Sequence, residues 1–201
     1  MKMILAEARR APGNSLDLVA LAPTLIGGFA LLMIWFKVRS LFGLLDVEGL
    51  EFKWGPFVTL MVLAAILALS SSYLFSLLAA SLARRLGGRG SSGELRAVWG
   101  AAAFPSIAIP LLIFPLDLLA VGTAAYTGDW EGTFETAWAA ISCALAISLA
   151  IYCSFLLFRG VSESTGLGRA RSLETAFSAV VVLGIVVGLL LFALTTIEGF
   201  A

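Results

Sequence analysis

Histidine is absent from this 201-residue chain, and cysteine occurs only twice. The lack of histidine excludes imidazole general bases, histidine metal ligands and histidine pH switches. Cys143 and Cys153 lie in one apolar segment, and ten residues of helix between them would separate them by roughly 15 Å, too far for a disulfide. We therefore expect both thiols to be reduced and structural.

Charge is also scarce, because 13% of the residues are charged and 60% are hydrophobic. The formal net charge is zero and no long basic run occurs, so no nucleic-acid partner is predicted. The sequence has no phosphate-binding glycine loop, no nucleophile elbow, no set of metal ligands and no pair of intramembrane acids. We expect no catalytic residue, no metal site, no cofactor and no enzymatic activity.

Long apolar stretches dominate what is present. Each is long enough to cross hydrocarbon as a helix, and each is apolar on every face, unlike the alternating strands of a membrane barrel. The five charge-free stretches are Leu18–Phe36, Phe57–Ala83, Ala97–Leu116, Thr136–Phe158 and Thr175–Ile197. We predict a single domain, 1–201, forming an all-α bundle of five membrane-spanning helices over about 18–36, 57–83, 97–121, 136–158 and 175–197.

Basic residues are distributed unequally between the two sides of such a bundle. The side with the N-terminal tail and the second and fourth connections carries ten: Lys2, Arg9, Arg10, Arg84, Arg85, Arg89, Arg96, Arg159, Arg169 and Arg171. The other side carries three: Lys37, Arg39 and Lys53. Because basic loops stay in the cytoplasm, we predict a cytoplasmic N-terminus, an outside C-terminus and a multi-pass location in the plasma (inner) membrane.

Local signals mark the ends of these helices. Proline near a helix start, glycine after a helix end, and serine followed by glutamate before an apolar run are typical boundary residues. In chain order the signals are Pro23, Pro56, Gly87-Gly88, the capping box Ser91–Glu94, and Ser172 with Glu174. Residues 1–17 carry several charges and no apolar core, so we expect the first span to remain as an anchor.

Two segments carry a family resemblance. Gly87-Gly88-Arg89-Gly90-Ser91-Ser92-Gly93-Glu94-Leu95-Arg96-Ala97-Val98-Trp99-Gly100-Ala101-Ala102-Ala103-Phe104-Pro105 is a glycine-rich loop running into an alanine-rich helix with a proline inside. Gly166-Leu167-Gly168-Arg169-Ala170-Arg171 is a short basic loop before the last span. In order and spacing they resemble the Yip (Ypt-interacting protein) membrane family, whose five-span layout also matches.

The resemblance implies a small membrane protein without catalysis, linked in eukaryotes to Rab-type GTPases. This chain lacks the long N-terminal domain with an Asp-Leu-Tyr-Gly-Pro motif that the eukaryotic branch carries. It is similar to the prokaryotic-type branch, so binding of a Rab-type GTPase is not predicted.

Asp117 is the intramembrane polar candidate, because a carboxylate beside an apolar run is unfavourable in lipid unless it is paired, protonated or near water. One interpretation is an ion or proton site, helped by three prolines that free backbone carbonyls nearby: Pro105, Pro110 and Pro115. The other is that Asp117 reaches the outer interface near Trp130 and Trp138. We expect the interfacial position, exposed to the outer water.

Small residues in the last two spans are candidates for helix packing. Gly184 and Gly188 form a GxxxG pattern, and Ala140 and Ala144 begin a row that continues to Ser148. Such rows let helix backbones approach closely, either within one chain or between two copies. Serines at 70–72 could line a polar path or bond back to helix carbonyls, and we favour the second interpretation.

Arg84, Arg85, Arg89 and Arg96 are candidates for contact with lipid headgroups, although topology signalling alone would also explain them. The predicted partners are membrane lipids, with other membrane proteins or a second copy as further options. We expect a non-catalytic organising or interaction component of the membrane. The alternative is a small transporter, channel or lipid-moving protein that uses Asp117, and a water-filled cavity reaching Asp117 would favour it.

Overall fold

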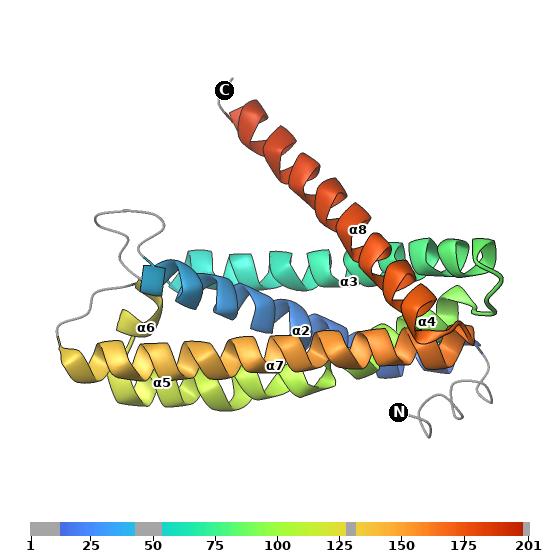
Figure 1. The fold of residues 1–201 in the computed structure, drawn as a ribbon. Coiled ribbons are helices and arrows are strands. Elements are labelled where there is room, and N and C mark those ends of the chain that lie inside the picture. The colour runs from blue at the N-terminus through green and yellow to red at the C-terminus, as the bar shows by residue number, and fades with distance from the viewer. Residues whose placement is uncertain (1–12, 43–53, 128–131, 199–201) are drawn as a thin grey trace.

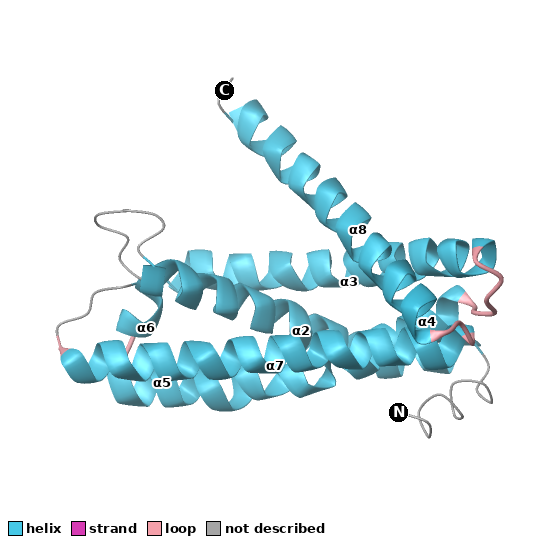
Figure 2. Ribbon diagram, in the orientation of Figure 1, coloured by secondary structure: helices cyan, strands magenta, loops and turns pink. Residues whose placement is uncertain are grey.

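A computed structural model describes residues 13–42, 54–127 and 132–198, and every element in these ranges is helical (Figure 1, Figure 2). Four long α-helices are α2 (Gly13–Phe42), α3 (Trp54–Arg85), α7 (Thr133–Thr165) and α8 (Arg169–Glu198). Between α3 and α7 the helical chain runs through α4 (Ser92–Ala103), a 3₁₀ turn η1 (Phe104–Ile107), a π turn η2 (Ile109–Ile113), α5 (Phe114–Val121) and the short α6 (Ala124–Thr127).

Four of these stretches are long and apolar enough to cross a membrane: Leu21–Val38, Phe57–Arg85, Ser92–Val121 and Thr133–Thr165. Their outward surfaces are apolar, with side chains such as Leu119, Leu111 and Ile151 well over half exposed. A surface of this kind suits lipid rather than water. The prediction of an all-α fold is confirmed. The fifth predicted span corresponds to α8, which has the length of a crossing helix and whose side chains are described as far as Ile185.

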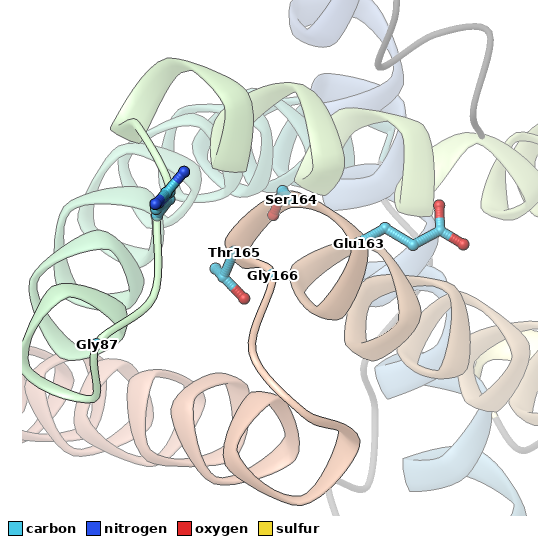
Figure 3. Close-up of a pocket in the computed structure, with 6 residues that line it drawn as sticks. Gly87, Glu163, Ser164, Thr165 and Gly166 are labelled. Carbon is cyan, nitrogen blue, oxygen red and sulfur yellow. The ribbon is translucent and has the colours of Figure 1, made fainter.

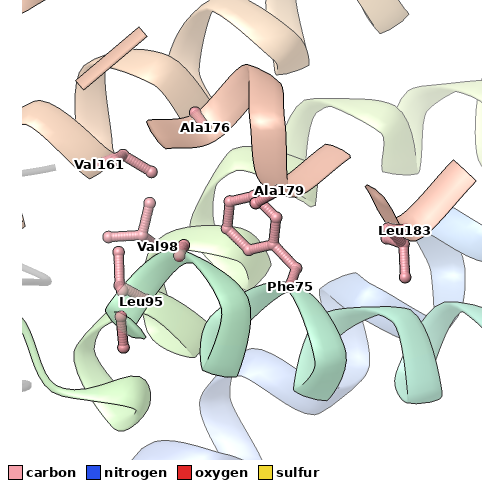
Figure 4. Close-up of a cluster of buried hydrophobic side chains, with 9 residues drawn as sticks. Phe75, Leu95, Val98, Val161, Ala176, Ala179 and Leu183 are labelled. Carbon is pink, nitrogen blue, oxygen red and sulfur yellow. The ribbon is translucent and has the colours of Figure 1, made fainter. Parts of the chain in front are cut away.

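The helices α2, α3, α7 and the stretch α4–α5 lie side by side, and α8 crosses them near one end before it leaves the bundle at an angle (Figure 1). Near that crossing a buried cluster joins α3, α4, α7 and α8 (Figure 4). It includes Phe75, Leu95, Val98, Val161 and Ala179. A second cluster, toward the other end, includes Ala30, Met33, Phe57, Ile109 and Ala146. The apolar core is therefore divided along the length of the bundle.

The three prolines of the third span each open a new type of helix. Pro105 stands in the first turn of η1, Pro110 in that of η2 and Pro115 in that of α5. Proline removes one backbone donor and crowds the preceding turn, so the hydrogen-bond spacing changes where each one enters. The span remains helical, but only its two ends are regular α-helix.

Three of the predicted boundary signals are confirmed. Pro56 stands in the first turn of α3. After that helix, Gly87 has a φ of 83°, and the N–H of Gly88 donates to the carbonyl of Ala83 at 2.8 Å, a glycine-based C-cap. Ser91 caps α4 and forms the reciprocal capping box with Glu94.

Two boundary predictions are wrong. The helix α2 begins ten residues before Pro23, which therefore lies inside it. The helix α8 begins at Arg169, so Ser172 is already in its first turn and donates its hydroxyl back to the carbonyls of Leu167 and Gly168. In both cases the helix extends into polar sequence beyond the apolar run. The length of an apolar run indicates which part of a helix can lie in hydrocarbon, and it does not specify where the helix begins.

The predicted packing rows are also placed differently. Ala140 and Ala144 are exposed, and the buried small residues in this part of α7 are instead Ala139, Ser142, Cys143 and Ala146. A one-position shift turns the row by about 100° around a helix, which the spacing of small residues cannot specify. No described atom lies within 4 Å of a Cβ built at Gly184, so packing of Gly184 within the chain is not observed. The side-chain environment of Gly188 lies outside the described part, and contact between two copies stays a prediction.

Close approach between helices occurs at Gly28 instead. A Cβ built there would lie 2.6 Å from the carbonyl oxygen of Ala64 and 2.7 Å from the Cβ of Ala68. Helices α2 and α3 therefore cross at a point where only glycine fits on α2. Ser70 and Ser72, in the same region, donate to the helix carbonyls of Ile66 and Leu69. Bonding back to the helix is the interpretation that we favoured for these serines.

Candidate functional site

Asp117, in the first turn of α5, has no exposed surface at all. The prediction that it is exposed to outer water is therefore wrong. Trp138 does lie beside it, as expected, and Trp130 falls outside the described residues. A carboxylate this well buried in an apolar protein must be compensated by donors or by an opposite charge.

Three donors surround the Asp117 carboxylate. The Nζ of Lys37 lies 2.5 Å from Oδ2, and the hydroxyl of Tyr126 donates to the same oxygen at 2.7 Å. The indole Nε1 of Trp138 donates to Oδ1 at 3.1 Å. Charge neutralisation and hydrogen bonding thus come from three different helices, α2, α6 and α7.

Lys37 is buried as well, with 3% of its surface exposed. Besides Asp117 it donates to the hydroxyl of Ser142 at 2.7 Å, and that hydroxyl donates to the carbonyl of Ala139. The ammonium also lies 5.7 Å from the ring centroid of Tyr126. Lys37 directly follows the first predicted span, about 18–36, and was expected on the outer side of the membrane. In the structure α2 continues to Phe42, so Lys37 stands on the inward face of a helix.

A chain reversal brings Tyr126 back onto Asp117. Gly122 has a φ of 61°, which allows the chain to turn directly after α5, and α6 follows as a single turn. Burial, and then the hydrogen bond to Asp117, raise the pKa of the Tyr126 phenol well above its usual range. The phenol therefore stays protonated and acts as a donor.

Lys37, Tyr126 and Ser142 were not predicted as members of this site. One signal could have indicated the first of them: a lysine directly after one apolar run and an aspartate directly after another, at the same predicted end of the bundle. Two opposite charges at the same depth are natural partners in lipid. For Tyr126 and Ser142 the sequence carries no comparable signal.

The chemistry of this ion-pair site is limited by its enclosure. Asp117 has no surface in contact with solvent, and each carboxylate oxygen already accepts from a protein donor. Within the described residues, no group of three or more Cys, Asp or Glu side chains could hold a metal ion. The site therefore joins helices and neutralises charge, and offers no free group to a ligand.

At the opposite end of the bundle two short loops meet. The N–H of Arg89, after α3, donates to the carbonyl of Thr165 at the end of α7 at 2.8 Å. Gly88 lies so close to Leu167 that a Cβ would stand 2.8 Å from its Cγ. A hollow of about 350 Å³ opens beside this junction (Figure 3). Its lining residues are Gly87, Arg89, Glu163, Ser164, Thr165 and Gly166.

The four arginines proposed for lipid headgroups separate into two kinds. Arg84, Arg85 and Arg89 are exposed. Arg96 is half-buried, and its guanidinium lies over the ring of Tyr73, 4.0 Å from the centroid. Of the three exposed arginines, Arg84 also donates from its Nε to the carbonyl of Ala80 at 3.2 Å.

No protein-family model, no curated protein and no solved structure matches this chain.

Proposed function

We propose that this chain is a five-span, Yip-like integral membrane protein that acts as a non-catalytic organising or interaction component. Its N-terminus is cytoplasmic, its C-terminus is outside, and its basic loop junction faces the cytoplasm, where lipids or other membrane proteins contact it. The four apolar helices support a membrane location. The length of α8 supports a fifth crossing.

The observation that carries this proposal is the enclosure of Asp117. A transport site must bind and release its cargo, so its carboxylate needs access to water or to an exchangeable ligand. Here the carboxylate has no accessible surface and is held by Lys37, Tyr126 and Trp138. The groups available for contact lie at the other end, on the exposed arginines.

Co-purification tests the proposal. The full chain is crosslinked in native membranes, purified, and analysed for associated proteins and lipids. We expect reproducible partners that decrease when Arg84, Arg85 and Arg89 are changed together to Gln. A matched triple change on the lipid-facing surface, Leu111, Leu119 and Ile151 to Val, keeps the charge and serves as the control. Purification of the chain with no enriched partner would contradict an organising role.

Thiol labelling tests the predicted orientation. Cys143 and Cys153 are first changed to Ala, and single cysteines then replace the exposed residues Arg89, Arg169 and Gly132. In intact cells an impermeant reagent should label position 132 and leave positions 89 and 169 unlabelled. Labelling at position 89 or 169 from outside would contradict a cytoplasmic loop junction.

A transporter remains the second candidate because of the third span. Its 3₁₀ and π turns lead directly into the turn that carries Asp117, and non-α turns in a membrane helix often accompany functional sites. Ser142→Cys, in a chain whose Cys143 and Cys153 are changed to Ala, places a thiol beside Lys37, keeps both charges of the ion pair and distinguishes the two functions in membranes. Resistance to small water-soluble thiol reagents from both sides favours the organising component, and labelling favours a hydrated path.

A further inference from the structure

The hollow at the loop junction has a built framework. The bond from the Arg89 N–H to Thr165, and the contact of Gly88 with Leu167, hold the α3–α4 loop against the α7–α8 turn. Gly90 also packs on Thr165, with a built Cβ 3.3 Å from its Cγ2. The backbone from which the Arg89 side chain extends is thus fixed by contacts from both loops.

The guanidinium of Arg89 is available to a ligand. The side chain is exposed and lines the hollow, and among the described residues no group accepts a hydrogen bond or forms an ion pair with it. This end of the bundle is basic overall: among the residues here whose side chains are described, seven are arginines and three are glutamates, namely Arg84, Arg85, Arg89, Arg96, Arg159, Arg169 and Arg171 against Glu94, Glu163 and Glu174. Such a field attracts anions.

Glu163 is the one acidic residue in the lining, and one of its two carboxylate oxygens is paired. Its Oε1 accepts from the Nε of Arg159 at 3.0 Å. Figure 3 shows the Glu163 carboxylate directed away from Gly87 and Thr165. The Oε2 atom of Glu163 is buried and has no hydrogen-bond partner among the described residues. The pairing with Arg159 therefore reduces the repulsion of an anion by Glu163 only in part, and Arg89 is the one basic residue in the lining.

We propose that this hollow binds the phosphate group of an anionic phospholipid headgroup and that Arg89 is its phosphate ligand. Guanidinium binds phosphate through paired charge-assisted hydrogen bonds, and basic hollows at the inner membrane surface suit such headgroups. The assignment rests on the proposed function only in placing the loop junction at a membrane surface. A defined site at Arg89 differs from a general attraction of anionic lipids by the exposed arginines.

Native mass spectrometry of the purified full chain, in detergent micelles with added phosphatidylcholine, phosphatidylethanolamine and phosphatidylglycerol, measures the affinity of the first bound phosphatidylglycerol. We expect Arg89→Gln to weaken it about tenfold, whereas Arg85→Gln, which removes the same charge outside the hollow, changes it less than about threefold. Glu163→Gln should strengthen binding, and Arg159→Gln, which leaves Glu163 uncompensated, should weaken it. Thermal unfolding of each variant confirms that the chain is folded.

Three results would overturn the assignment. Equal losses in Arg89→Gln and Arg85→Gln would mean diffuse surface charge without a site. Preferential retention of phosphatidylethanolamine, lost in Glu163→Gln, would assign the hollow to a zwitterionic headgroup. Displacement of the lipid by submillimolar inorganic phosphate would assign it to a soluble anion. None of these results affects the search for co-purified proteins, so failure of the headgroup site is distinguishable from failure of the organising role.

Discussion

The two ends of this bundle use charge in opposite ways. At one end Lys37 and Asp117 are buried together and bonded to Tyr126, Trp138 and Ser142. At the other end the arginines that close α3 and follow it, Arg84, Arg85 and Arg89, remain exposed beside a polar hollow. Charged residues therefore hold helices together at the first end and are available for contact at the second.

The two ends differ because a charged side chain needs either a partner on another helix or access to the membrane interface. A single charge in hydrocarbon is unstable, so a helix that carries one must bring a partner on another helix. An arginine at the end of a helix can extend into the interface and needs no internal partner. Charges near span ends can therefore be structural or available, and only the neighbouring helices distinguish the two cases.

Breaking the ion pair should have the largest effect. Asp117→Leu leaves Lys37 buried without its counter-charge, and we expect a loss of about 3–5 kcal/mol in stability, measured by thermal unfolding in detergent. The double change Lys37→Met with Asp117→Leu removes both charges and should recover most of that loss. Full stability of the single variant would show that water reaches this end, and the contrast between the two ends would disappear.

Removing one hydrogen bond should have a smaller effect. Tyr126→Phe deletes the donor to Oδ2 of Asp117 and keeps the ring, so we expect a loss of about 1.5–3 kcal/mol, the range for a hydrogen bond to a charged group. Tyr152→Phe is the matched control, because Tyr152 is exposed on α7. Chemical unfolding should separate the two variants, and equal stability would mean that Lys37 and Trp138 alone satisfy the carboxylate.

Steric change at the helix crossing tests the packing between the two ends. Gly28→Ala places a methyl group against the backbone of α3 and should destabilise the chain by about 1–3 kcal/mol. Gly184→Ala meets open space and should leave thermal stability unchanged. If Gly184→Ala instead lowers the fraction of crosslinked dimer, the GxxxG pattern of α8 acts between two copies.

The capping box should give the smallest of these effects. Ser91→Ala removes the side-chain acceptor for the Glu94 N–H, and the expected loss is about 1 kcal/mol because the loop end is open to water. Ser92→Ala, one residue later, serves as the control. The circular dichroism melt of each variant measures the change. A loss as large as that of Asp117→Leu would mean that the loop junction is as important to the fold as the ion pair.

Much of the fold follows from local sequence signals. The apolar runs predict where the long helices lie, and the cap residues at 87–88 and 91–94 act within one turn of their own helix. Prolines at 105, 110 and 115 alter helical spacing through their own missing N–H groups. Each of these effects depends on neighbours in the chain, so the sequence contains it.

The packing partners required the tertiary structure. The sequence could say that Asp117 needs compensation, but the choice among water, a proton and Lys37 depends on how α2 is rotated against α5. The rotation of α7 about its own axis likewise decides that Ala139 and Cys143, rather than Ala140 and Ala144, are buried. In a helix that is apolar on all sides, no hydrophobic stripe specifies the inward face. The sequence by itself therefore determined the helices and their caps. Only the contacts between helices determined which charges are enclosed and which remain exposed.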